Sequence, residues 1–254
     1  MRLRAAAFGV ACLALCVVRT VHAQITPLFV IPTESTGAAV AAGAPVRVVL
    51  TASDAARLAA GLGVRALADS TSFEYTVGAY PQIVGPTDRT WLEATFVVDY
   101  DQPEFAPLKT EMAVLGPKPT RAQIVEFVNR TVDERAPRGW DLASTVAKRR
   151  QGDCSEHAVL TAALARMYGI PARVMVGIAL LSAGNDFAAY GHAWTEMQEG
   201  GKWVVADAAM LEMAASVRYI PMGLMEDEGM GYVMSLAGLS NQWIQKVKVL
   251  GPAD

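Results

Sequence analysis

The sequence has 254 residues, enough for one large domain or two small ones with a hydrophobic core. Hydrophobic residues make up 52% of it, which excludes a disordered chain, and they are spread too widely for a bundle of membrane helices. The formal net charge is −3, which argues against nucleic acid as a partner.

The first 23 residues have the order of features typical of a secretory signal peptide. Arg2 and Arg4 give a positive start, an apolar stretch covers residues 5–18, and the small Ala23 precedes Gln24. A helix over that stretch is only about 21 Å long, short for a hydrocarbon core of about 30 Å. We therefore expect cleavage after residue 23, a periplasmic or secreted protein, and no stable membrane insertion afterwards. An uncleaved N-terminal anchor is the alternative.

Cleavage would change the inventory of reactive side chains. The mature chain would hold 19 basic and 25 acidic residues, and Cys154 would be its only cysteine. A single cysteine cannot form an internal disulfide, so it indicates either intermolecular pairing or a working thiol. The histidines that remain are His157 and His192.

Residues 24–117 are predicted to form a β-rich N-terminal region without a catalytic motif. It opens with a loose segment at 24–45, and Ser53 caps a possible helix over 53–67. Runs of β-branched and aromatic residues predict strands at 46–50, 73–77 and 91–100. The stiff Gly116-Pro117-Lys118-Pro119 segment is the predicted boundary, which makes 118–254 the second unit.

Residues 118–254 read as helices followed by an antiparallel sheet, an α+β arrangement. A capping box of Thr120 and Gln123 opens a helix to about residue 134, and a short helix at 141–150 follows. The helix at 154–168 is apolar nearly all round and should be buried. Strands are predicted at 173–181, 192–198, 202–207 and 243–250, and Gly200-Gly201 forms the turn of a hairpin.

The only mature thiol lies where the buried helix begins. Unpaired N–H groups carry about half a positive charge at a helix N-terminus, and this charge stabilises a thiolate at Cys154. Antiparallel pairing across the hairpin should make His192 and Asp207 neighbours, although the pattern does not show that this edge faces the helix. If it does, Cys154 is the nucleophile, His192 its base and Asp207 the group that orients the imidazole.

The motifs around these residues resemble the bacterial transglutaminase-like superfamily over roughly residues 120–212. The resemblance rests on Gly152-Asp153-Cys154-Ser155-Glu156-His157-Ala158, Ala163-Leu164-Ala165-Arg166, Gly169-Ile170-Pro171-Ala172-Arg173, His192-Ala193-Trp194-Thr195-Glu196, Trp203 and Asp207. It implies a papain-like α+β core of helices packed on an antiparallel sheet, preceded here by the β-rich region, with Cys154, His192 and Asp207 as a catalytic triad.

The sequence departs from this family in two places. Ala208 stands where many relatives have proline. The Met-rich segment after Asp207 matches nothing we can name, which leaves the substrate cleft open; its methionines are Met210, Met213, Met222, Met225, Met230 and Met234. We expect this segment to be pliable core or cleft lining.

Several polar and aromatic residues near these motifs allow other roles. A zinc site of Cys154, His157, His192 and Asp207 is the metal alternative, although we expect no cofactor and a packing or hydrogen-bonding role for His157. Arg166 and Arg173 are predicted to form structural ion pairs, and Trp194 and Trp203 to lie in the sheet core. Gln151 and Trp140 are the side-chain candidates for an oxyanion hole, which also uses the Cys154 N–H.

Two classes of function follow from these residues. The first is a thiol enzyme that forms a thioester with a peptide or isopeptide amide and passes the acyl group to water or to an amine. That class includes cysteine proteases, amidases and cross-linking acyltransferases, and a peptide or protein would be the substrate. The second is a non-catalytic peptide-binding module on the same fold.

Overall fold

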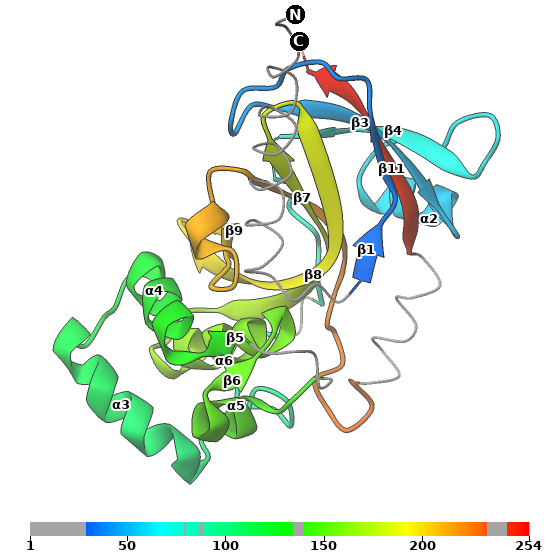
Figure 1. The fold of residues 1–254 in the computed structure, drawn as a ribbon. Helices are drawn as coiled ribbons and strands as arrows, with labels where there is room; N and C mark the ends of the chain where they lie inside the picture. The colour runs from blue at the N-terminus through cyan, green and yellow to red at the C-terminus, as the bar shows by residue number, and fades with distance from the viewer. Residues whose placement is uncertain (1–28, 79, 87–88, 135–139, 233–242, 254) are drawn as a thin grey trace, which may run out of the picture.

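The computed structural model describes residues 29–78, 80–86, 89–134, 140–232 and 243–253. A strongly curved antiparallel sheet runs through the molecule, with β7 and β8 as its longest strands (Figure 1). Its order is β1-β8-β7-β10, and β9 pairs with the same edge of β8 as β1 does. The bounds are β1 (Phe29–Ile31), β7 (Ala172–Ala183), β8 (Asp186–Glu199), β9 (Lys202–Ala206) and β10 (Val217–Leu224).

A second sheet joins the two ends of the described chain. Its order is β2-β11-β3-β4, with β2 parallel to β11 and the other pairs antiparallel. The bounds are β2 (Thr33–Ser35), β3 (Val46–Ala52), β4 (Ser72–Val77) and β11 (Ile244–Pro252). The last strand therefore belongs to the sheet of the N-terminal region. A short parallel pair, β5 (Asp133–Glu134) and β6 (Gln151–Gly152), lies just before the thiol.

The helices gather mainly at one end of the molecule. Figure 1 shows α3 to α6 at the lower left, whereas α2 accompanies the second sheet on the right. Their bounds are α2 (Ala55–Gly61), α3 (Ala106–Met112), α4 (Arg121–Thr131), α5 (Ala143–Arg149) and α6 (Cys154–Met167), with 3-10 turns η1 (Pro103–Phe105), η2 (Ala113–Leu115) and η3 (Leu211–Met213). All residues of α6 except Met167 are buried, because α4 and α5 pack on one side of it and the curved sheet on the other.

The expected α+β class with an antiparallel sheet and a β-rich N-terminal region is confirmed. The capping box of α4 is present as predicted, and the helices over 141–150 and 154–168 form within one or two residues of their expected bounds. The hairpin turn at Gly200 and Gly201 is also present, with φ values of 56° and 78° that suit glycine.

Three expectations for the N-terminal half were wrong. The loose segment at 24–45 contains β1 and β2, and the helix over 53–67 is shortened to Ala55–Gly61, capped by Asp54 instead of Ser53. Residues 91–100 form no strand. Their backbone partners are scattered, since the N–H of Val97 donates to the carbonyl of Glu228 and its carbonyl accepts from Ala143.

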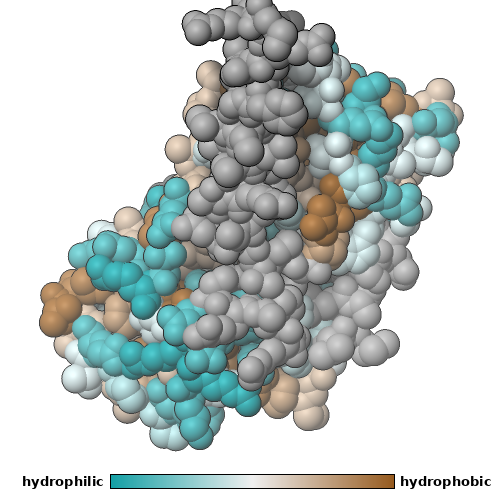
Figure 2. All heavy atoms as spheres, in the orientation of Figure 1, coloured by the Kyte–Doolittle hydropathy of each residue, from teal (hydrophilic) through white to brown (hydrophobic). Residues whose placement is uncertain are grey.

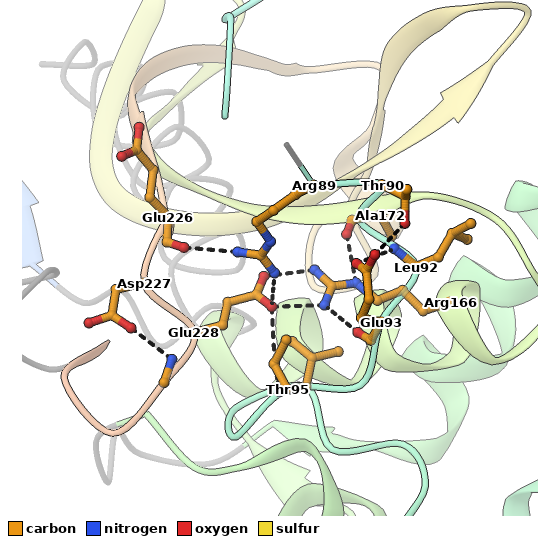
Figure 3. A network of polar contacts seen from close by, with 12 residues as sticks. Arg89, Thr90, Leu92, Glu93, Thr95, Arg166, Ala172, Glu226, Asp227 and Glu228 are labelled. Carbon is orange, nitrogen blue, oxygen red and sulfur yellow. Dashed lines mark hydrogen bonds and ion pairs between the residues drawn. The ribbon is translucent and has the colours of Figure 1, made fainter. Parts of the chain in front are cut away.

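A buried ion-pair network ties this irregular segment to the core (Figure 3). Both carboxylate oxygens of Glu228 accept from the Arg166 guanidinium, at 2.7 and 2.8 Å, and Arg89 donates to Oε2 at 2.8 Å. Thr95 adds a fourth hydrogen bond at 3.0 Å. The network thus joins residues from before the Gly116–Pro119 connector to helix α6 and to the segment after β10.

One hydrophobic cluster also contains residues from both sides of the connector. Val97, Phe105 and Leu108 share it with Ile124 and Leu160. The boundary at residue 117 stays a prediction, and a fragment experiment described below addresses it.

In the view of Figure 2, hydrophilic residues cover much of the helical end. No helix among the described residues is long and apolar enough to cross a membrane. The predicted signal peptide at 1–23 lies outside the described residues, as does Met234.

Candidate active site

Cys154 is the first residue of α6, and two acidic side chains fix the helix start. The Asp153 side chain accepts from the Ser155 N–H at 2.8 Å, and the Glu156 carboxylate accepts from the Asp153 N–H at 2.9 Å. Gly152 is needed because a Cβ there would lie 2.2 Å from the Cβ of Glu156. The thiol therefore sits at a rigid helix N-terminus, where it is 2% exposed.

These two acids crowd each other in the buried turn. Glu156 also accepts from the N–H of Asp141 at 3.1 Å, whereas Oδ2 of Asp153 is buried without a hydrogen-bond partner among the described residues. Burial is the main cause that raises the pKa of Glu156, to about 7, and the neighbouring Asp153 carboxylate adds to it. The charge beside Cys154 thus changes within the neutral pH range.

His192 and Asp207 are joined by a hydrogen bond of 2.7 Å between Nε2 and Oδ2. His192 lies within β8, and Asp207 follows the end of β9, which pairs with β8 up to Thr195↔Ala206. The expectation that the hairpin makes them neighbours is therefore met. With Nε2 engaged by the carboxylate, Nδ1 is the ring nitrogen left to exchange a proton with a reacting group.

The Asp207 carboxylate accepts four hydrogen bonds. Oδ1 takes the N–H groups of Ala209 and Met210 at 3.0 and 3.2 Å, and Oδ2 takes the Tyr219 hydroxyl at 2.8 Å in addition to His192. Burial raises the pKa of Asp207, but the charge of His192 and these hydrogen bonds outweigh it, and the net pKa lies below the usual value. The carboxylate is thus held in its ionised form.

Helix α6 is attached to β8 close to this pair. The Thr195 hydroxyl, three residues after His192, donates to the carbonyl of Ala158 at 2.6 Å. His157, one turn after the thiol, interacts electrostatically with both Asp207 and His192. The first turn of α6 and the His192–Asp207 pair therefore form one buried cluster, a docking that the sequence pattern alone does not provide.

His157 has a structural contact of its own in this cluster. Its Nδ1 lies 2.8 Å from the carbonyl oxygen of Asp153, so the ring donates from Nδ1. Burial lowers the pKa of His157, which keeps the ring neutral. The described residues contain no group of three or more side chains arranged to hold a metal ion.

The two oxyanion candidates differ in their surroundings. Gln151 is exposed in β6, whereas Trp140 is partly buried against the main hydrophobic cluster. The carbonyl of Trp140 accepts from the Tyr232 hydroxyl at 2.8 Å, which fixes the backbone at that point. Both assignments stay predictions.

The two arginines expected in ion pairs both form them, fully buried. Arg166 pairs with Glu228, and Arg173 pairs with Glu196 at 2.6 Å. Trp194 is buried as expected, and it stacks beside His192 with 6.0 Å between the ring centroids.

Two tyrosines near the site were missed by the sequence analysis, Tyr80 and Tyr219. The Tyr80 hydroxyl accepts from the indole N–H of Trp194 at 2.9 Å and donates to Glu196 at 2.5 Å. Tyr219 comes from β10, a strand interrupted by proline and glycine. Neither tyrosine lies in the motif region around the thiol, so no spacing signal pointed to them.

A separate cavity of about 630 Å³ lies near the turn of the β8–β9 hairpin. Trp91, Arg173 and Trp203 line it, and the Arg173 guanidinium stacks on the Trp203 ring at 4.2 Å. Cys154, His192 and Asp207 are not among its lining residues.

The fold that carries this cluster is a transglutaminase-like α+β core. Residues 116–208 match the model of the transglutaminase-like superfamily. No curated protein matches the sequence significantly.

Solved structures with a similar fold come from two bacteria. A candidate cysteine protease from Cytophaga hutchinsonii is 21% identical, with a TM-score of 0.40, and the match covers 59% of this chain and 54% of that one. The periplasmic domain of TgpA from Pseudomonas aeruginosa is 18% identical, with a TM-score of 0.42, and the match covers 72% and 75%. The chain thus spans about half the length of the first of these proteins.

Proposed function

We propose that the protein is an exported thiol enzyme that cleaves or transfers peptide or isopeptide amide bonds through Cys154, His192 and Asp207. The observation that carries the proposal is the buried 2.7 Å hydrogen bond between His192 and Asp207, on a strand that Thr195 attaches to the helix that Cys154 begins. A thiol at a helix N-terminus and an imidazole held by a carboxylate are the groups that nucleophilic acyl transfer requires.

The chemistry proceeds in two halves. The Cys154 thiolate attacks the amide carbonyl, the C–N bond breaks, and the His192 imidazolium gives its proton to the departing amine. Water or a second amine then attacks the thioester, His192 takes the proton of that nucleophile, and the C–S bond breaks to restore the thiolate. Asp207 keeps the ring oriented through Nε2 and stabilises its charge in both halves.

Alkylation by iodoacetamide at different pH values tests the thiolate without a known substrate. The wild-type protein should react well below the pH of about 8.5 at which an ordinary thiol ionises. Cys154→Ser should not react, and His192→Ala should shift the reaction toward that ordinary pH. His157→Ala is the matched control and should keep the wild-type profile. A wild-type curve that rises only near pH 8.5 and is unchanged in His192→Ala would contradict the proposal.

The alternative of a peptide-binding module is favoured by one observation, the 2% exposure of Cys154. An enzyme must admit the carbonyl carbon of its substrate to this thiol. Incubation with an activated ester such as p-nitrophenyl acetate, followed by mass spectrometry, separates the two functions. An acyl group on Cys154 that is lost on adding an amine supports the enzyme, and peptide binding without any acyl adduct supports the module.

A further inference from the structure

Tyr219 makes a contact that the triad assignment leaves unexplained. Its hydroxyl donates to Oδ2 of Asp207 at 2.8 Å, the same oxygen that engages Nε2 of His192 at 2.7 Å. One carboxylate oxygen therefore accepts from both the imidazole and the phenol. The other oxygen is held by two backbone N–H groups, so the carboxylate is fixed from four directions.

The phenol keeps its proton in this position. Burial raises the pKa of Tyr219 well above the ordinary value, and the negative charge of Asp207 raises it further. The hydroxyl therefore stays protonated at neutral pH and donates its hydrogen bond there. Because this donor is neutral, it fixes Oδ2 without adding a second positive charge that would compete with His192 for the carboxylate.

Tyr219 lies on β10, which approaches β7 very closely at Gly177. Strand β7 lies between β8 and β10, and Gly177 of β7 is paired with His192 on one side and with Pro221 on the other. A Cβ at Gly177 would lie 2.2 Å from the carbonyl oxygen of Ile220 and 2.8 Å from the Trp194 ring. Because Gly177 has no side chain, Trp194 can lie across β7. The centroids of the Trp194 and Tyr219 rings are 5.1 Å apart.

We propose that Tyr219 is a positioning residue of the site, which fixes the Asp207 carboxylate and shares the charge that this carboxylate presents to His192. The role rests on the proposed function, because it matters only if His192 exchanges protons during a reaction. Since Oδ2 divides its hydrogen bonding between two donors, the imidazolium is held less tightly than by an unshared carboxylate. His192 can then release its proton to the leaving amine more readily.

The test replaces the hydroxyl and nothing else. In Tyr219→Phe the oxygen Oδ2 keeps its bond to His192 alone, so the midpoint of the His192 ring titration, followed by NMR, should move to higher pH by about half a unit. The turnover number with an ester substrate should fall about tenfold, while KM stays near the wild-type value. Tyr75→Phe is the matched control, since Tyr75 is a buried tyrosine of the second sheet.

The outcomes separate the two claims. A His192 midpoint that stays at the wild-type value, or moves to lower pH, would overturn the role of Tyr219 even if the protein is an active enzyme. An upward shift in a protein that shows no acylation would support the contact and remove the proposed function. If Tyr219→Phe does not fold, Tyr219→His takes its place in the test, because its ring can keep a donor near Oδ2. A folded Tyr219→His should then have a His192 midpoint close to that of the wild type. A midpoint far from the wild-type value also overturns the proposal.

Discussion

Arg166 and Glu228 form a two-bond ion pair in which both side chains are almost completely buried, 0% and 1% exposed. Figure 3 shows that Arg89 approaches the same carboxylate from the N-terminal region. Two arginines thus share one glutamate as their counter-charge. The contact joins helix α6 to the segment around Arg89 and to the segment after β10.

Glu228→Gln should be strongly destabilising, because it leaves the buried Arg166 guanidinium and the partly exposed Arg89 guanidinium without a counter-charge. Breaking one partner of a buried pair costs about 3–5 kcal/mol. The free energy of unfolding in urea measures the effect. Glu126→Gln is the control, since Glu126 and Arg130 form an exposed pair on α4 that should contribute less than about 0.5 kcal/mol. Equal losses in the two variants would contradict this account.

Glu156 should make stability depend on pH near neutrality. Its pKa is about 7 in the fold against an ordinary value of 4.5. The unfolded chain therefore loses this proton first as pH rises, and stability falls between pH 4.5 and 7 by on the order of 3 kcal/mol. Urea unfolding at pH 5 and pH 8 should show this fall in the wild type and a smaller one in Glu156→Gln. A parallel dependence in both proteins would assign the effect to other groups.

Gly177→Ala should damage both the sheet and the site. The new methyl group would meet the backbone of Ile220, which cannot move without shifting β10, so we expect a loss of about 1–3 kcal/mol. Because Trp194 must also move, the pH profile of Cys154 alkylation should change. Gly61→Ala is the control, at a helix position where a Cβ meets nothing within 4 Å, and it should be neutral or slightly stabilising. If Gly177→Ala is as stable as the wild type, β10 can shift at little cost and this prediction is wrong.

The fragment 118–254 tests the predicted boundary at residue 117. It lacks Arg89, Thr95 and the strands β2, β3 and β4, so Glu228 loses two hydrogen-bond partners and β11 loses both of its neighbouring strands. We expect an insoluble or molten fragment, while residues 24–254 give a cooperative unfolding transition. A fragment that is soluble and unfolds cooperatively would establish the boundary instead.

The predicted start of the mature protein is tested by mass spectrometry of the processed protein. The small residue at Ala23, after the apolar stretch, predicts a first residue at Gln24. Recovery of an intact Met1 on a membrane-bound product would show an uncleaved anchor.

The sequence was informative where local signals agree with the final packing. The apolar composition of α6 and the Gly200-Gly201 turn each act within a few residues, so the helix and the His192–Asp207 contact could be predicted. The attachment of α6 to β8 could not, because the bond from Thr195 to Ala158 joins residues 37 apart.

Other features are set by long-range contacts that override local preference. Residues 91–100 have the composition of a strand, yet Trp91 has φ of 59° and both Val97 and Val98 are buried, which an alternating strand with one buried face does not allow. Strand β10 was hidden by Pro221 and Gly223, which mark its register shift, and its role in holding Asp207 was hidden with it.

The parallel pairing of β2 with β11 has a consequence for the order of folding. Val247 pairs with Thr33 and also with Leu50, so the second sheet is closed by residues about 200 positions apart. A growing chain therefore holds β2 and β3 without the strand that lies between them until β11 has been made. Contacts of such long sequence separation make folding slow, and they leave strand edges open to other chains in the meantime. Deletion of β11 should thus expose the edges of β2 and β3 and cause aggregation.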